Sequence, residues 1–263
     1  MKNMKTLKVF LAILIAVTIV SCSKDKEEVR VNFLLTDAPS YENFQEVNID
    51  IREVHFSTNE GWDQLAIQPA IYNLLDLTNG LDTLLAHVYL DEGTRINQVR
   101  LVLGPNNSVK TDDGIIHSLA TPSANTSGLK VNVHQNANVE SEYSIMIDFD
   151  ASRSIVQQGN GDYSLKPVIR SYMVQNTSYI DGNIVPGDVP YKVFVTAGQD
   201  TISTLSDPLI NNYFRIHGLF SGTYTLKVQD LNNDMIIKDT TINVVGGRNV
   251  ILGNFYLPVT MPM

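Results

Sequence analysis

Apolar and polar residues alternate through most of this chain, and this two-residue period constrains the fold more than any other feature. From Val29, apolar side chains recur at Val31, Phe33 and Leu35. Side chains two residues apart point to the same face of a strand, so this run predicts a strand with one buried face. The pattern returns in "VNIDIREVHF", "INQVRLVLG" and "YSIMIDFD". Because turn-forming Gly, Pro, Asn and Asp separate these runs, the sequence predicts an all-β fold.

Two segments depart from the simple alternation. In "VNIDIREVHF" the apolar positions change phase between Ile51 and Val54, which predicts a β-bulge. Further along, four apolar residues have the i, i+3, i+4 and i+7 spacing of a helix stripe: Leu81, Leu84, Leu85 and Val88. Glycines flank this stripe, and we expect one short amphipathic helix there, covering an end of a β-sandwich.

A change of composition divides the chain. Asn, Ser, Gly and Pro accumulate between Gln175 and Pro190, where we place a linker. Short alternating strands on both sides predict two β-sandwich domains, residues 29–172 and residues 173–263, the second including the linker.

The first 21 residues have the features of a secretory signal peptide. They contain three lysines and no acid, followed by a twelve-residue run from Val9 to Val20 in which Thr18 is the polar residue. A membrane-spanning helix needs about 20 apolar residues, so this run is too short for one. The residue that follows, Cys22, is the only cysteine in the chain.

The stretch Ile19 to Cys22 resembles the lipobox of bacterial lipoproteins. The resemblance implies cleavage before Cys22 and attachment of a diacylglycerol to its sulfur, with residues 22–28 as a lipidated tether. The alternative is an incidental thiol, but a secreted chain would then carry an unpaired reactive cysteine. Acyl chains contribute about 0.8 kcal/mol per buried methylene, so the lipid bilayer of the outer membrane is the first expected partner.

The tether itself leaves two interpretations open. "SKDKEE" resembles the acidic signal that directs lipoproteins of the Bacteroidota to the cell surface, and a plain solvated linker is the alternative. The face of the outer membrane, cell surface or periplasmic, therefore stays open.

Charge excludes one class of partner. The leader holds three of the 19 Lys and Arg residues and none of the 28 Asp and Glu residues, which leaves the processed chain sixteen against 28, a net charge of −12. Nucleic-acid binding needs basic surface that displaces counterions from phosphates, so we expect no nucleic-acid partner.

Several motifs follow one another over residues 29 to 172: "LLTDAPS", "YNLLDLTNGLDTLLA", "RINQVRLVLG", "IDFDAS" and "YSLKPVIR". In this order they resemble a family of secreted proteins, the domain-of-unknown-function family numbered four-three-eight-two. The resemblance implies a β-rich domain outside the cytoplasm with no established activity. Thr94 and Arg95 depart from the family pattern, which favours Tyr after the preceding glycine.

The second domain contains the stretches "GNIVPGDVPYKVFV" and "FRIHGLFSGTYTLKV". Over residues 178 to 258 this pattern resembles the carboxypeptidase regulatory-like, transthyretin-like module. It implies a small β-sandwich without peptidase machinery, in which Tyr224 and Leu226 point inward. Asn211 and Asn212 replace the Asp-Gly that the module usually has at this turn, and they suit a tight turn as well.

Catalytic signals are sparse. The five histidines form no metal-binding H-E-x-x-H pattern, and no G-x-S-x-G nucleophile motif occurs. We therefore expect neither a catalytic residue nor a cofactor.

Three carboxylates are the best remaining candidates for chemistry. Asp148 and Asp150 stand two residues apart in one strand, roughly 7 Å apart on what we take to be its outward face. Together with Asp37 they could hold calcium, which takes oxygen ligands. The alternative, which we favour, is that they make the sheet surface soluble and cap a turn. "DLNND", from Asp230 to Asp234, begins like a calcium loop but lacks its glycine and final Glu, so we interpret it as a hairpin turn.

Two function classes follow. The first is a non-enzymatic envelope lipoprotein that binds or scaffolds a surface protein or glycan, with Trp62 as a possible stacking platform or as ordinary packing beside a turn. The second is a calcium-dependent or hydrolytic enzyme with an acidic site at Asp37, Asp148 and Asp150. The absence of a paired nucleophile and base in the sequence favours the first.

Overall fold

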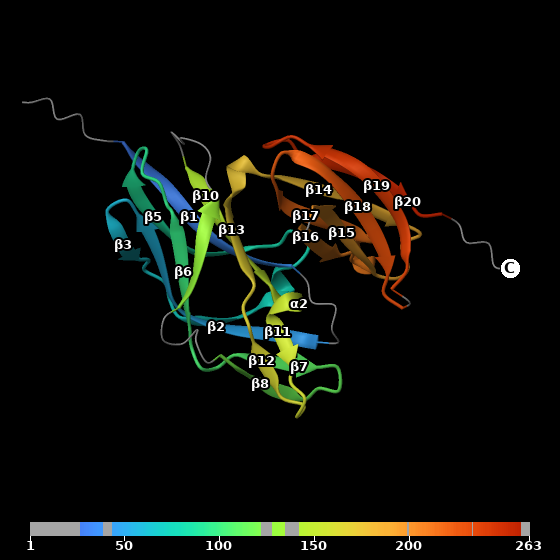
Figure 1. Ribbon diagram of the computed structural model, residues 1–263, viewed down its shortest axis with the longest axis horizontal. Helices are drawn as coiled ribbons and strands as arrows, with labels where there is room; N and C mark the ends of the chain where they lie inside the picture. The colour runs from blue at the N-terminus through green and yellow to red at the C-terminus, as the bar shows by residue number, and fades with distance from the viewer. Residues whose placement is uncertain are drawn as a thin grey trace, which may run out of the picture.

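The computed structural model describes residues 27–38, 44–121, 128–134, 142–198, 200–232 and 234–258 (Figure 1). Cys22, the signal peptide and most of the tether lie outside these residues. Among the described residues, no helix combines the length and the apolar character needed to cross a membrane.

The described chain is all-β and contains two sandwich domains, which form separate lobes in Figure 1. In the first domain one large sheet has the order β11-β12-β8-β7-β2-β6-β9-β13-β10-β1-β5, and β3 and β4 also pair with β2. Its strands are β1 (Glu28–Ala38), β2 (Phe44–Thr58), β3 (Gly61–Gln64), β4 (Ala70–Asn73), β5 (Thr83–Asp91), β6 (Gln98–Leu103), β7 (Ser108–Thr111), β8 (Ile116–Ala120), β9 (Leu129–His134), β10 (Tyr143–Asp150), β11 (Ile155–Gln157), β12 (Tyr163–Leu165) and β13 (Ile169–Met173). Short helical turns are η1 (Leu74–Leu77), α2 (Ala151–Ser154) and η2 (Val174–Asn176).

This sheet curls around one apolar core. Phe33 of β1 and Phe56 of β2 are separated by several strands in the sheet order, yet their ring centroids lie only 5.8 Å apart. Val31, Phe33 and Leu35 are fully buried, which confirms the alternation predicted for β1. Burial of such side chains stabilises a fold by about 1.5–3 kcal/mol each.

The predicted bulge in β2 is present. The register between β2 and β6 shifts between Ile51 and Glu53. Arg52 is the extra residue and is exposed, while Ile51 and Val54 both point into the core. An unpaired residue of this kind lets the apolar face continue in the opposite phase.

The predicted helix at residues 81–88 is wrong, because this segment contains strand β5, which pairs antiparallel with β1. Its register shifts so that Phe33 pairs with Ala86 and Leu34 with Leu84, which leaves Leu85 as a bulge. The bulge places Leu85 and Ala86 side by side on the buried side and leaves Leu84 exposed. One extra residue in an alternating strand thus produced the three- and four-residue spacings of a helix.

The second domain packs two smaller sheets, with orders β17-β14-β20 and β16-β15-β18-β19. Its strands are β14 (Ser178–Val185), β15 (Tyr191–Ala197), β16 (Asp200–Leu205), β17 (Tyr213–Leu219), β18 (Gly222–Asp230), β19 (Ile236–Val244) and β20 (Val250–Tyr256), with a helical turn η3 (Pro208–Ile210). Tyr224, Leu226 and Val228 of β18 are buried in its core, which confirms the inward face predicted for "TYTLKV".

Strand β14 corrects our interpretation of the polar segment. Residues 178–185 lie within the expected linker, yet they form the central strand of a sheet, between β17 and β20. Ile180 and Ile184 are fully buried. The Asn, Gly and Asp residues between them led us to predict a linker from composition. A short strand, however, needs only two or three apolar side chains to fill its side of a small core.

Candidate functional site

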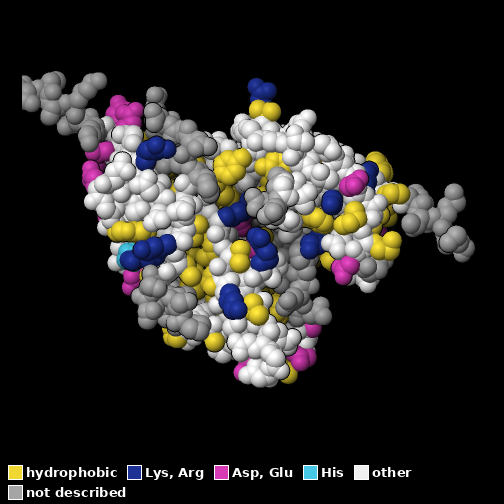
Figure 2. All heavy atoms as spheres, in the orientation of Figure 1, with side chains coloured by type: hydrophobic (Ala, Val, Ile, Leu, Met, Phe, Trp, Pro, Cys, Tyr) yellow, Lys and Arg dark blue, Asp and Glu magenta, His cyan; other side chains and the backbone are white. Residues whose placement is uncertain are grey.

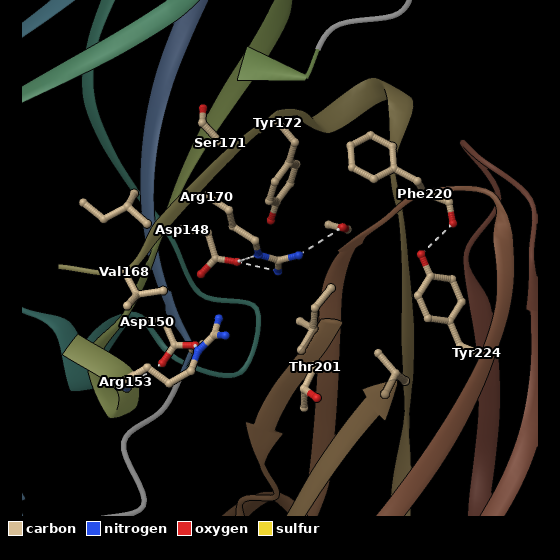
Figure 3. Close-up of a pocket in the computed structure, with 15 residues that line it drawn as sticks. Asp148, Asp150, Arg153, Val168, Arg170, Ser171, Tyr172, Thr201, Phe220 and Tyr224 are labelled. Atoms are coloured by element: carbon tan, nitrogen blue, oxygen red, sulfur yellow. Dashed lines mark hydrogen bonds and ion pairs between the residues drawn. The ribbon is translucent and has the colours of Figure 1, made fainter. Parts of the chain in front are cut away.

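The two domains meet in a cleft of about 350 Å³ (Figure 3). Strands β10 and β13 of the first domain line one side, and β15, β16, β17 and β18 of the second line the other. In Figure 2, Lys and Arg side chains lie among hydrophobic ones along the junction of the two lobes. The lining residues are Ala38, Asp148, Asp150, Arg153, Val168, Ile169, Arg170, Ser171, Tyr172, Val195, Thr201, Ile202, Gly218, Phe220 and Tyr224.

Two of the predicted acids lie in this cleft. Asp148 pairs in register with Thr36, and Asp150 with Ala38, so both carboxylates share one face of β10 as their spacing predicted. We had expected this face to point outward to solvent, but the second domain covers it. Asp148 is 2% exposed and Asp150 is 8% exposed.

Asp37 lines a small cavity together with Asp148, although it belongs to a different face of the sheet. It pairs in register with Phe149, so it belongs to the opposite face of the sheet, the one that faces the core. Its carboxylate accepts a hydrogen bond from the Ala151 amide at 2.9 Å. Burial raises the pKa of Asp37 well above its ordinary value, and the negative charges of Asp148 and Asp150 add to this effect.

The floor of the cleft is an ion pair that also joins the domains. Arg170 of β13 is the direct cross-strand partner of Asp148, and its Nε donates to Asp148 Oδ2 at 2.6 Å. The same guanidinium donates to the carbonyls of Gly218 and His217, at 3.2 and 3.1 Å, on β17 of the second domain. Arg170 therefore uses one side chain to hold Asp148 and the backbone of the other domain (Figure 3).

A second ion pair stands at the mouth. Asp150 Oδ1 caps the short helix α2 by accepting from the Arg153 amide at 2.9 Å, and its Oδ2 accepts from Arg153 Nε at 2.6 Å. The Arg153 side chain is 58% exposed, so its terminal nitrogens face solvent at the cleft. Each acid of the cleft is thus neutralised by one arginine.

Tyr172 and His217 extend the domain contact behind the ion pair. The Tyr172 hydroxyl lies 2.9 Å from His217 Nδ1, and burial lowers the pKa of His217 to about 4. Gly218 makes room for this contact, because a Cβ there would meet the Tyr172 ring at 2.4 Å. On a neighbouring loop, Asn79 bonds the backbone of β17 by donating to the Tyr213 carbonyl and accepting from the Arg215 amide.

The serine of the cleft does not face a base, because Ser171 Oγ donates to the Met146 carbonyl. Within the described residues, no group of three or more His, Cys, Asp or Glu side chains is placed to hold a metal ion. One acceptor stays open: Asp148 Oδ1 is buried and has no hydrogen-bond partner in the described part of the chain. The apolar walls and this one oxygen suit an amphipathic group.

The other predicted positions lie elsewhere. Asp230 Oδ1 accepts from the Asn232 amide at the β18–β19 connection, which is the hairpin turn that we expected from "DLNND". Trp62 lies on β3 of the first domain, does not line the cleft, and is 41% exposed. Sequence reasoning missed Arg170 and Tyr172. Arg170 is the last residue of "YSLKPVIR", and Tyr172 follows it on β13, the strand beside β10. Only the β10–β13 register brings them to the cleft.

Comparison with protein families identifies the first domain. A model of "Domain of unknown function (DUF4382)" matches residues 28–167. The chain belongs to this family. The match confirms the resemblance stated for the first domain. It places Asp148, Asp150 and Arg153 within the DUF4382 domain, whereas Arg170 and Tyr172 follow its matched end.

Other comparisons add little. No curated protein matches this DUF4382 chain in sequence. Among solved structures, the Bacillus anthracis TIE protein is similar at 10% identity and a TM-score of 0.25, over 88% of this chain and 34% of that one, so the chain spans about a third of that protein's length.

The minor pilin GBS52 of Streptococcus agalactiae shares 12% identity at a TM-score of 0.25, over 89% of this chain and 98% of that one. A fimbrial protein from Bacteroides ovatus shares 10% identity at a TM-score of 0.23, over 88% and 50% of the two chains. These scores are low, and the likenesses carry no argument about function.

Proposed function

We propose that this protein is a non-enzymatic lipoprotein of the outer membrane, anchored through acylated Cys22, whose interdomain cleft binds a surface protein or glycan. The cleft is the observation that carries the proposal. It combines apolar and aromatic walls with charges that are already paired with one another, which is typical of a binding site and not of a site poised for proton transfer.

The size and polarity of the cleft limit what enters it. Its volume of about 350 Å³ lies at the lower end of ligand sites, so it accepts one small group and not a folded surface. Val195, Ile202 and Phe220 provide apolar contact on the second domain. Asp148 Oδ1 accepts a hydrogen bond from the bound group, and the exposed end of Arg153 donates one.

Two features support lipid anchoring: the signal peptide that precedes Cys22, and the short distance in sequence between Cys22 and the first strand. Strand β1 begins at Glu28, six residues after Cys22, so the folded body starts within a short tether of the acylated residue. The second domain, with its two sheets and buried Tyr224, supports our proposal that it is a carboxypeptidase regulatory-like module. Such a module would serve here as the second wall of the cleft.

The proposal is tested by using the protein to capture its partner from the native envelope. The parent is compared with a variant in which a large side chain fills the cleft. Thr201 is exposed at the cleft mouth, and Thr201→Trp places an indole in the space a ligand would occupy. Thr241→Trp on β19 is the matched control, because Thr241 is also exposed and is not among the residues that line the cleft.

We expect the parent and Thr241→Trp to retain the same envelope component and Thr201→Trp to lose it. Equal retention by all three proteins would overturn the cleft as the binding site. Calorimetric titration with calcium tests the enzymatic alternative at Asp37, Asp148 and Asp150. Stoichiometric calcium binding lost in Asp148→Asn would favour that alternative.

A further inference from the structure

Two aromatic rings are exposed in a second hollow, at the far end of the first domain from the cleft. This groove of about 420 Å³ lies between the β2–β3 hairpin and the end of β5. Trp62 of β3 and Tyr89 of β5 both line it, and they are 41% and 56% exposed. Large aromatic side chains normally gain free energy by burial, so two exposed rings in one groove indicate a contact surface.

The Trp62 ring is held from outside the groove. The Arg100 guanidinium lies 5.2 Å and the Lys130 ammonium 5.5 Å from the ring centroid, and neither residue lines the groove. Cations over an aromatic ring stabilise its position by about 0.5–1 kcal/mol at exposed sites. Tyr89 packs edge-on against His87 with centroids 5.8 Å apart. Both rings are therefore held in position and remain partly exposed.

The charges around the groove select against charged ligands of either sign. The charged side chains in its lining are all acidic, Glu60, Asp63 and Asp91, so an anionic ligand would be repelled. Arg100 and Lys130 both lie close to the Trp62 ring, so a cationic ligand stacking on the ring would be repelled as well.

From these observations we propose that the groove between Trp62 and Tyr89 binds an uncharged glycan. Sugar rings have apolar C–H faces that pack on flat aromatic rings, and their hydroxyls donate to carboxylates, the stronger class of O–H hydrogen bond. The groove supplies both partners, with Thr58 and Thr94 as further hydroxyl contacts. The proposal goes beyond the function proposed above, because no residue of the interdomain cleft takes part.

The test uses the full chain in detergent on an array of glycans that holds neutral, uronic-acid-containing and sulfated members, together with a lysine-rich peptide. We expect binding to at least one neutral glycan and none to the sulfated members. Trp62→Ala and Tyr89→Ala each weaken that binding by about ten-fold or more, the loss typical of a central aromatic contact. Trp62→Phe, which keeps a ring, retains more of the affinity than Trp62→Ala.

Tyr256→Ala is the matched control. Tyr256 is 62% exposed on β20 of the second domain, so its loss leaves binding unchanged. Thr201→Trp in the interdomain cleft also leaves it unchanged, which separates this proposal from the one above.

Three outcomes overturn the proposal: no neutral glycan binds, anionic glycans or the basic peptide bind better than neutral ones, or binding survives both Trp62→Ala and Tyr89→Ala. Thermal melts of each variant show whether the fold is kept, and since both side chains are exposed, small shifts are expected.

Discussion

The hydroxyl of Tyr172 in the first domain lies 2.9 Å from Nδ1 of His217 in the second, at the back of the interdomain cleft. His217 is enclosed there together with Arg170 and Asp148, and its charged form is disfavoured by the loss of water. The docking of the two domains therefore includes a titratable group that must stay neutral.

The contribution of His217 to stability is expected to fall as the pH decreases from 6.5 towards 4. The pKa of His217 is lowered to about 4 in the folded protein, so between these values the unfolded chain binds a proton that the folded chain does not. Since one pKa unit corresponds to about 1.4 kcal/mol, the loss reaches about 2–3 kcal/mol at the acid end. Urea unfolding at a series of pH values measures it. A parent and a His217→Gln variant with the same pH dependence would contradict this assignment.

Asp37→Asn is expected to stabilise the protein at neutral pH. The pKa of Asp37 is raised by burial, so its stabilising protonated form is present at low pH and is lost as the pH rises through the folded-state pKa. An amide keeps the acceptor for the Ala151 amide and removes the buried charge. Unfolding at pH 7 and at pH 4 should show the gain at pH 7 alone. A destabilised Asp37→Asn at pH 7 would show that the carboxylate is needed.

Asp148→Ala is expected to cost about 3–5 kcal/mol, because it leaves the Arg170 guanidinium without its buried partner. Asp150→Ala is the comparison, since Arg153 is largely exposed, and its cost is set by the lost helix cap, about 0.5–2 kcal/mol. Denaturant unfolding of the full chain measures both. Equal costs for the two single variants would contradict the inferred burial.

Tyr224→Ala is expected to destabilise the second domain by about 3–5 kcal/mol, since it removes a buried aromatic ring. Tyr256→Ala, at an exposed tyrosine of the same domain, should stay within about 0.5 kcal/mol of the parent. Thermal and chemical unfolding of the full chain compare the two. If both variants behave alike, the inward face of β18 has been assigned wrongly.

Cys22→Ala is expected to move the protein from the membrane fraction to the soluble fraction of the envelope, because the acyl chains are the proposed anchor. Fractionation with immunodetection measures the distribution, and mass spectrometry of the parent should show an acylated N-terminus at Cys22. Unchanged membrane association of the variant would refute lipid anchoring at this residue.

Local spacing was enough to predict much of this fold. In β1, β2, β6 and β10 the apolar residues point inward as their two-residue period requires, and the bulge in β2 follows from one change of phase. The pairing of Asp148 and Asp150 on one face of β10 follows from the same period. These properties depend on the direction of neighbouring side chains along one strand, which the order of residues determines.

Long-range pairing and domain docking decided the rest. The register of β5 against β1 turned a helix-like spacing into a bulged strand, and the sheet of the second domain turned a polar segment into the central strand β14. Whether the Asp148 face of β10 meets water depended on where the second domain docks, and there it is buried. Arg170 reaches Asp148 only because β13 lies beside β10. The order of residues determines which side chains share a face of a strand. Contacts between distant segments determine what covers that face, because the free energy of burial is summed over the whole fold.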